Sequence, residues 1–272
     1  MGLRINTNIA SMNAQRHMGN VTMRLQGNYS RLASGLRIAS AADDAAGLAI
    51  SERMRSQIRS YGVAARNTQD GISLAQTAES ALNEVSNLLI RARELSVQSA
   101  NGTLAQADRN TIQVEVDAII DELTRISTEA VFNGVALLDG TGTVNIQVGI
   151  EAGQTVSINA VDTTVSTLGV DTLNITSQGA ASAALGTLDT AIGSVNTARG
   201  QLGAAQNRMQ SALSTTLNVR ENLSAAESRI RDVDIASETA DLTRNSIMQQ
   251  AAVSILQQAN VQPQIALSLI QG

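Results

Sequence analysis

The sequence of 272 residues contains no cysteine and no lysine, and it has one histidine and one proline. Without cysteine there are no disulfides, thiolate metal ligands or thiol nucleophiles. With His17 as the single histidine, neither a zinc site built from several histidines nor an acid–base pair of two histidines can form within one chain. Without lysine, a nucleotide-binding phosphate loop is incomplete. These absences argue against most enzyme classes, and we predict a protein that is not an enzyme and has no metal or cofactor.

Aromatic residues are equally scarce, with Phe132, Tyr29 and Tyr61 as the only three. Aromatic rings provide the largest single portions of buried area, so this chain must bury area through many Ala, Leu, Ile and Val contacts. Such contacts are typical of long helix–helix seams, meaning lines of residues that face a neighbouring helix. Because the one proline is Pro263, little else in the chain prevents continuous helix.

Long apolar runs and a uniformly basic surface are also missing. No stretch approaches eighteen apolar residues, and the first residues lack the basic flank and apolar core of a Sec signal, so we predict no membrane insertion. Residues 1–60 carry eight arginines against three acids, whereas residues 221–272 carry three arginines against six acids. The net charge of −5 and the lack of aromatic interleaving argue against nucleic-acid binding. We expect the attraction between the arginine-rich N-terminal end and the acidic C-terminal end to set the register in which the two ends pack.

The clearest pattern is a run of apolar or small residues spaced alternately by four and three. It comprises Ala184, Leu188, Ala191, Val195, Ala198, Leu202, Ala205, Met209, Ala212, Thr216, Val219, Leu223, Ala226, Ile230 and Val233. Seven uninterrupted heptads are typical of a coiled-coil seam. Because Gly186, Gly193, Gly200 and Gly203 weaken helix, the pattern leaves the start open between Ala180 and Leu202.

Two further seams predict partners for this helix. One comprises Leu74, Ala78, Ala81, Val85, Leu88, Ala92 and Leu95, and the other Ile112, Val116, Ile119, Leu123 and Ile126. Between them, Asn101 and Gly102 predict a helix stop and Asp108 a new N-cap, so we expect the two helices to reverse direction there. Residues 131–178 alone indicate β-structure, with VNIQVG and TVSINA as short strands and DGTG and EAGQ as turns.

The two ends of the chain each predict an amphipathic helix without a partner. The first contains Met18, Val21, Leu25, Tyr29, Leu32 and Leu36, with a break at Ser34 and Gly35, and the second contains Ile247, Ala251, Ile255 and Ala259. Neither end can bury its apolar line alone. The ends therefore pair with each other, pair with other copies, or stay disordered in the monomer.

Asp43 and Asp44 are the one adjacent acidic pair that invites a chemical interpretation. They could form an acid–base pair or bind a divalent cation. Carboxylates also favour the positive N-terminal end of a helix, and the helix-forming segment AAGLAISERMRSQI follows directly, so we predict that they start a helix.

The segment from Leu32 to Ile58, LASGLRIASAADDAAGLAISERMRSQI, resembles the N-terminal signature of bacterial flagellins. Its signature residues are Leu32, Gly35, Leu36, Arg37, Asp43, Asp44 and Gly47. The resemblance continues through MGLRINTNIASMNAQ, ALNEVSNLLIRARELSVQSANGT, FNGVALLDG, QLGAAQNRMQSAL, NLSAAESRIRDVDIASE and SILQQANVQPQIALSLI. Many independent motifs occur in family order over nearly the whole chain.

The resemblance implies a mainly α fold, in which N- and C-terminal segments form a long antiparallel coiled-coil bundle with a small β-hairpin region mid-chain. It implies an inner layer of residues 1–40 and 235–272, and an outer layer of residues 41–234 with the hairpin at about 131–178. The space from 150 to 180 is too short for an added outer domain. A flagellin is exported unfolded, polymerises through its terminal helices and forms the extracellular filament for swimming.

The resemblance also implies partners. They are other copies of the chain, an export chaperone, the filament cap, hook–filament junction proteins and a Toll-like receptor of innate immunity. IRARELSVQSAN resembles the receptor-contacting motif, so Arg91, Leu95 and Glu115 are carried over as contact residues, with packing between protofilaments as the alternative role. Two other functions stay open: a hook–filament junction protein, and a cytosolic coiled-coil signalling rod.

Overall fold

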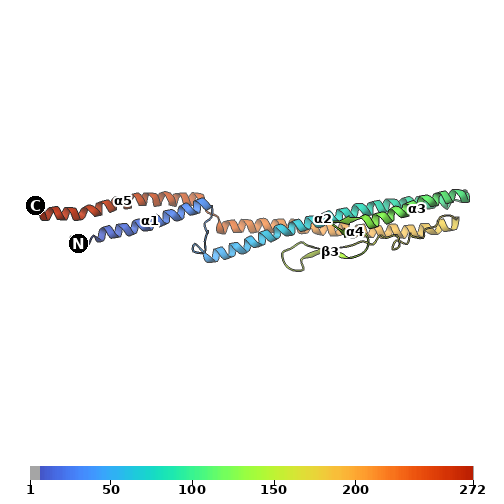
Figure 1. The fold of residues 1–272 in the computed structure, drawn as a ribbon, viewed down its shortest axis with the longest axis horizontal. Helices are drawn as coiled ribbons and strands as arrows, with labels where there is room; N and C mark the ends of the chain where they lie inside the picture. The colour runs from blue at the N-terminus through green and yellow to red at the C-terminus, as the bar shows by residue number, and fades with distance from the viewer. Residues whose placement is uncertain (1–6, 272) are drawn as a thin grey trace. The chain divides into compact units, whose positions relative to one another are not determined.

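A computed structural model describes residues 7–271 of the chain, with side chains described as far as residue 261. It contains α1 (Ile9–Ser34), α2 (Ala45–Ser99), α3 (Gln106–Glu129), α4 (Gln178–Arg231) and α5 (Ile235–Gln271), together with β1 (Val131–Phe132), β2 (Val135–Ala136), β3 (Thr143–Gln147) and β4 (Thr155–Asn159) (Figure 1). The prediction of a mainly α fold with a small β region is confirmed.

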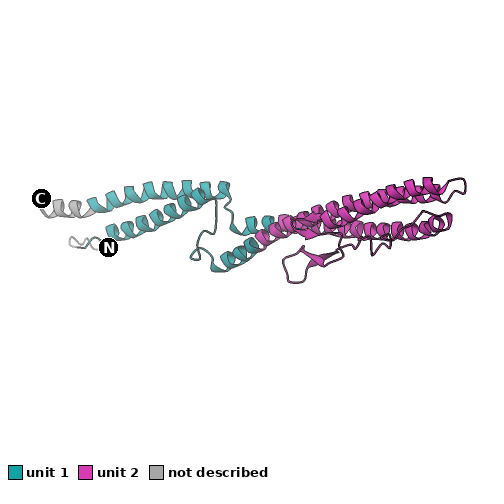
Figure 2. Ribbon diagram, turned by 45° about the vertical axis from the view of Figure 1, so that its right-hand side comes forward, with its two compact units in different colours: residues 1–56, 222–272 teal, residues 57–221 magenta. Residues whose placement is uncertain are grey.

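The chain divides into two compact units, one of residues 1–56 with 222–272 and one of residues 57–221 (Figure 2). We call them unit 1 and unit 2. Helices α2 and α4 contribute residues to both units. The predicted division into polymer layers near residues 40 and 235 concerns the assembled state and stays a prediction.

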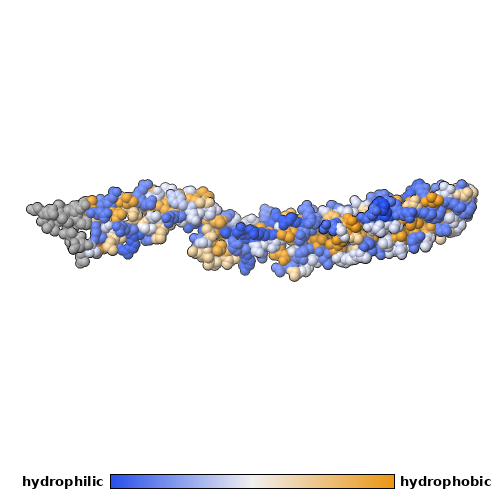
Figure 3. Space-filling view, viewed as in Figure 1, coloured by the Kyte–Doolittle hydropathy of each residue, from blue (hydrophilic) through white to orange (hydrophobic). Residues whose placement is uncertain are grey.

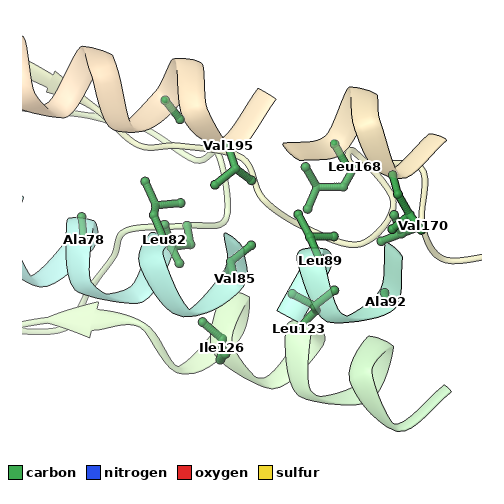
Figure 4. Close-up of a cluster of buried hydrophobic side chains, with 14 of the residues drawn as sticks. Ala78, Leu82, Val85, Leu89, Ala92, Leu123, Ile126, Leu168, Val170 and Val195 are labelled. Carbon is green, nitrogen blue, oxygen red and sulfur yellow. The ribbon is translucent and has the colours of Figure 1, made fainter. Parts of the chain in front are cut away.

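Unit 2 contains the main hydrophobic core, which α2, α3 and α4 build together with the segments between α3 and α4. Leu82, Val85 and Leu89 of α2 are fully buried. Figure 4 shows Leu82 and Val85 between Val195 on one side and Ile126 on the other, and Leu89 between Leu168 and Leu123. The three predicted seams therefore meet in one bundle. Their aliphatic side chains supply the buried area that aromatic residues provide elsewhere.

The α4 seam is buried from Ala184 to Met209, and farther along only Thr216 of the predicted residues is buried. The helix begins at Gln178, two residues before the range from Ala180 to Leu202 that the sequence left open. Gly186, Gly193 and Gly200 are exposed, and a Cβ at each would meet nothing within 4 Å. Their low helix propensity is outweighed by the buried seam on the other side of the helix.

The turn between α2 and α3 reverses the chain as predicted, but its cap differs. The N-cap of α3 is Ala105, and Asp108 lies three residues farther on, where its carboxylate accepts the Ala105 N–H at 3.1 Å. The prediction of Asp108 as N-cap is therefore wrong by one helical turn. The carboxylate still satisfies a free amide at the helix start, which is the physical role that favoured an acid there.

The β region contains two antiparallel pairs. β3 pairs with β4 from Thr143 opposite Asn159 to Gln147 opposite Thr155, which confirms the two predicted strands. β1 and β2 form a second, two-residue pair whose turn, Asn133–Gly134, has φ values of 48° and 80°. Asn-Gly is the usual signal for such a hairpin turn, and the sequence analysis missed it because the flanking strands are so short.

Candidate assembly surface

The first and last helices of the chain, α1 and α5, pack side by side in opposite directions in unit 1. We call this helix pair the terminal hairpin, although its two helices are not consecutive in sequence. Asn8 caps α1 by accepting the Ser11 N–H at 3.1 Å, and its side-chain amide donates to the Ala259 carbonyl at 2.7 Å. Near the other end of α1, the Asn245 amide donates to Asn28 Oδ1 at 2.7 Å. Of the alternatives that the sequence left open, pairing between the ends is the one present in this structure.

Small and polar residues dominate the buried seam of this hairpin. The buried residues of α1 are Ser11, Ala14, Leu25 and Asn28, and those of α5 are Asn245, Ala252 and Ala259. The predicted residues Met18, Val21 and Leu32 are half-buried beside them. Leu25 is the one large apolar side chain that is fully enclosed among the described residues of the hairpin, so the pair gains little from hydrophobic burial.

Two residues of the predicted apolar line of α1 do not belong to the buried seam. Tyr29 is 59% exposed, and Asn28 takes its place in the seam because it continues the heptad spacing from Leu25. Leu36 follows the helix and forms an isolated β-bridge with Asp232. A helix that ends at Ser34 cannot present Leu36 on the same line.

The predicted apolar line of α5 splits between two faces. Ala259 is buried against α1, whereas Ile247 and Ile255 are 60% and 61% exposed and Ala251 is also exposed. The seam follows Asn245, Ala252 and Ala259 at intervals of seven. At 100° per residue Ile247 lies about 140° around the helix from the centre of that seam, and Ile255 lies about 60° from it, beside the seam. Among the residues that the structure describes, this exposed apolar line has no partner.

α1 also carries apolar side chains on the side away from the seam. Ile9, Met12 and Met23 are exposed by 56%, 60% and 63%. Their helical positions lie roughly opposite those of the seam residues. Figure 3 shows hydrophobic residues among hydrophilic ones on the surface of this part of the chain. Together with the α5 line, these residues give the hairpin two exposed apolar faces.

The signature segment connects α1 to α2 and is hydrogen-bonded to the connection between α4 and α5. Gly35 ends α1 with φ 72°, a conformation that favours glycine, and its carbonyl accepts the Val233 N–H at 3.0 Å. The Arg37 N–H donates to the Arg231 carbonyl at 2.6 Å, and the Arg37 guanidinium donates to the Ile230 carbonyl at 2.6 Å. These contacts hold the two connections side by side.

Asp44 bonds to the backbone at the start of α2, which confirms the prediction of a helix start for this residue, whereas Asp43 bonds to the turn that precedes the helix. Asp44 accepts the Gly47 N–H at 2.9 Å. Hydrogen bonds from the backbone and hydroxyl of Ser40 hold the pKa of Asp43 below its usual range. Gly47 is required by space, since a Cβ there would lie 2.7 Å from Ile38 Cδ1. The acidic pair therefore has a local structural role.

The receptor-contact residues carried over from the resemblance occupy two different environments. The Arg91 guanidinium donates to Glu115 at 2.7 Å and to Glu94 at 3.2 Å across the exposed surface of α2 and α3. The bond to Glu115 is the largest contribution that raises the pKa of Arg91. Leu95 is 3% exposed within the unit 2 core. This burial agrees with the place of Leu95 in the predicted α2 seam, whereas Arg91 and Glu115 are accessible. The contact role of the three residues stays a prediction.

Two general features concern the described part of the chain. Among residues 7–271, no cluster of three or more histidine, aspartate or glutamate side chains has the proximity that a metal ion needs. None of the helices described there combines the length and apolar character required to cross a membrane.

Two family models match the chain. Residues 5–143 match the bacterial flagellin N-terminal helical region, and residues 185–270 match the bacterial flagellin C-terminal helical region. Together they include all five helices in whole or in large part.

Individual proteins are similar over nearly the full length. A flagellin of Halalkalibacterium halodurans is 44% identical over 98% of this chain and 99% of its own length. A flagellar filament 33 kDa core protein of Treponema phagedenis is also 44% identical, with the same coverage, and a flagellin of Bacillus subtilis is 42% identical over 99% of this chain and all of its own length.

Solved structures agree with these matches. The crystal structure of Bacillus cereus flagellin is 34% identical, with a TM-score of 0.51, and the match covers 56% of this chain and 88% of that chain. A putative flagellar hook-associated protein from Vibrio parahaemolyticus gives a TM-score of 0.56 over 71% of this chain and 99% of its own. At 16% identity, that second likeness concerns the fold alone.

Proposed function

Because this chain belongs to the bacterial flagellin family, we propose that the two exposed apolar faces of its terminal hairpin are the contacts through which copies join. The chain is a structural subunit of the flagellar filament, and it self-associates into a homopolymer, since its full-length relatives are flagellins and filament core proteins. The family is one of structural proteins, and we propose no catalytic role for this member.

The observation that supports this assignment of contacts is the unpartnered α5 line. Ile247 and Ile255 remain more than half exposed although α5 is already paired with α1. Contiguous exposed apolar side chains mark interaction surfaces in water-soluble chains. Ile9, Met12 and Met23 form a different face on α1. Two unlike faces on one hairpin suit the heterologous contacts of an open helical polymer.

Charged substitutions on the α5 line provide the test. Ile247→Asp with Ile255→Asp should abolish filament formation in seeded polymerisation, scored by negative-stain electron microscopy and sedimentation. Burying two carboxylates in an apolar contact is strongly unfavourable. The matched control is Gln250→Asp with Gln257→Asp, which adds the same charge to exposed positions of the same helix and should retain filaments.

The outcomes separate the alternatives. Normal filaments from the Ile247 and Ile255 variant would show that this line is not a contact. A parent chain that yields only short rings would favour the hook–filament junction role instead, and a parent that stays monomeric would favour the signalling rod. The flagellin relatives at 42–44% identity support the filament role over both.

The filament is an extracellular structure, and we propose that the chain reaches it by secretion in an unfolded state. A hairpin seam with Leu25 as its one large buried side chain is compatible with such an export state, because its folding free energy before assembly is small. We further propose an export chaperone, the filament cap and junction proteins as partners of the same exposed faces. Recovery of the intact chain from culture medium, and its loss in an export-deficient strain, would test secretion.

We propose receptor and protofilament contacts for the accessible pair Arg91 and Glu115. Arg91→Ala with Glu115→Ala should weaken activation of a Toll-like receptor reporter by purified monomer. Because the pair is exposed, the same change should leave thermal unfolding nearly unaltered. An unaltered reporter response would contradict the receptor role.

A further inference from the structure

The hairpin seam has polar side chains at both ends, and they bond across the two helices. Near the chain termini, the Ser11 hydroxyl donates to Asn260 Oδ1 at 2.7 Å. Near the connections, Asn28, Arg31, Glu238 and Asn245 form one hydrogen-bonded group, which we call the Asn28 cluster. Between the two ends the seam consists of small and aliphatic side chains.

The two asparagines of the Asn28 cluster are buried, whereas Arg31 and Glu238 beside them are half-buried. Asn28 is 2% exposed and Asn245 is 8% exposed. Asn28 Nδ2 donates to Glu238 Oε1 at 2.5 Å, while Asn28 Oδ1 accepts from Asn245 at 2.7 Å. Arg31 Nε donates to the same Glu238 oxygen at 2.9 Å. Both polar groups of the Asn28 amide therefore have partners, and both partners belong to α5.

The small side chains between the two polar ends of the seam do not define a unique register. Ala252 and Ala259 are seven residues apart, so a slip of one heptad replaces one small side chain by another. The expected complementarity of the charged ends is also limited, because Arg31 and Glu238 are the one ion pair between α1 and α5 among the described side chains. After a slip, Asn28 would face α5 without Asn245, and a buried amide would lose its partners.

We propose that the Asn28 cluster fixes the register of α1 against α5, and thereby positions the two assembly faces relative to each other. This inference rests on the proposed function of those faces. A slip of one heptad would move the Ile247–Ile255 line along α1 by about 10 Å. Each copy in a helical polymer must present the same composite surface, so a mixture of registers is incompatible with regular assembly. A single buried asparagine has this register-setting role in coiled coils.

Distances measured within filaments test the proposal. Because the chain has no cysteine, spin labels can be placed on cysteines introduced at the exposed residues Gln26 and Gln257, which lie apart along the axis of the helix pair, so that a slip changes their distance. Labelled copies are diluted among unlabelled copies during polymerisation, and pulsed electron resonance gives the intramolecular distance. The parent chain should give one narrow distance. Asn28→Leu with Asn245→Leu should add a second population displaced by about 10 Å.

The matched control is Met18→Leu with Val21→Leu, which adds leucine to half-buried seam positions and retains the cluster. It should give the single parental distance. A single parental distance from the Asn28 and Asn245 variant would overturn the proposal. If the labelled parent forms no filaments at all, the proposed function fails instead, and the two failures are thus distinguishable.

If the variant Asn28→Leu with Asn245→Leu does not assemble, exchanging the charges of Arg31 and Glu238 provides a second test. Arg31→Glu places two carboxylates together beside Asn28 and should reduce filament yield by about tenfold or more. Arg31→Glu with Glu238→Arg restores opposite charges across the seam and should recover most of that yield. Failure of the exchange to recover assembly, with the hairpin helical by circular dichroism, would also overturn the proposal.

Discussion

Glycines in the long helices show how a single residue depends on what lies against it. A Cβ on Gly71 of α2 would lie 2.8 Å from Ile146 Cγ1 and 2.9 Å from Met209 Sδ, so β3 and α4 approach this helix only because the side chain is absent. Gly193 of α4 faces open space. The same residue type is therefore a packing requirement at one position and a loss of helix propensity at the other.

We expect Gly71→Ala and Gly193→Ala to change stability in opposite directions. The first should lower the free energy of unfolding by about 1–3 kcal/mol, because Ile146 and Met209 must shift within a packed core. The second should raise it by about 0.5–1 kcal/mol through helix propensity. Urea unfolding of the monomer, followed by circular dichroism, measures both. Equal effects would show that β3 does not pack closely on α2.

At the scale of elements, one buried arginine joins the end of α2 to the start of α3. Arg109 is 7% exposed, and its guanidinium donates to the carbonyls of Ser99 at 2.9 Å and Asn101 at 2.7 Å. The Ser99 carbonyl lies in the last turn of α2, where carbonyls lack donors within the helix, and the Asn101 carbonyl just beyond it also accepts the Leu104 N–H at 3.3 Å. The reversal of the chain, which the sequence predicts from Asn101 and Gly102, is thus stabilised by a residue of the next helix.

Arg109→Met should lower the free energy of unfolding by about 1–3 kcal/mol, because it leaves the buried Ser99 carbonyl without its donor. Arg93→Met serves as the control, since Arg93 pairs with Asp189 at the surface with 42% of its side chain exposed. Arg93→Met should lower the free energy of unfolding by less than about 1 kcal/mol. Thermal and urea unfolding of the two variants side by side would decide. If Arg109→Met lowers the free energy of unfolding no more than Arg93→Met does, water must supply the hydrogen bonds to the carbonyls at the end of α2.

The distribution of burial over the whole molecule separates a well-packed unit from a weakly packed one. Unit 2 encloses fully buried leucines and valines from three helices, whereas the hairpin of unit 1 encloses Leu25 and mostly alanine, serine and asparagine. Regions with little buried apolar area open at low free energy. Assembly then provides the apolar contacts that the hairpin lacks.

Hydrogen exchange should therefore differ between the units and between states. In the monomer, amides of α1 and α5 should exchange close to unprotected rates, while those of α2 to α4 around Leu82 and Val195 stay protected. In the filament, α1 and α5 should become protected, because copies cover the Ile247–Ile255 line. Mass spectrometry of pulse-labelled monomers and filaments measures this. Equal protection of both units in the monomer would contradict the assignment.

The sequence by itself determined the helices, the reversal at Asn101 and Gly102, the strands around Val144 and Val156, and the family. These features depend on local propensity and on repeating patterns, which a linear sequence displays directly. It also indicated that Asp44 starts a helix, because its carboxylate bonds to an amide only three residues farther on, whereas Asp43 bonds back to Ser40.

Only the tertiary structure decided which face of each terminal helix is buried. The apolar line from Ile247 to Ile255 predicts the contact, yet α5 buries Asn245, Ala252 and Ala259 against α1. Likewise Asn28, not Tyr29, enters the seam. Hydrophobic periodicity identifies the faces of a helix that need a partner. When a helix has two such faces, the periodicity does not show which face packs within the chain and which packs against another copy. That choice depends on the amides of Asn28 and Asn245 meeting across the hairpin, 217 residues apart in sequence.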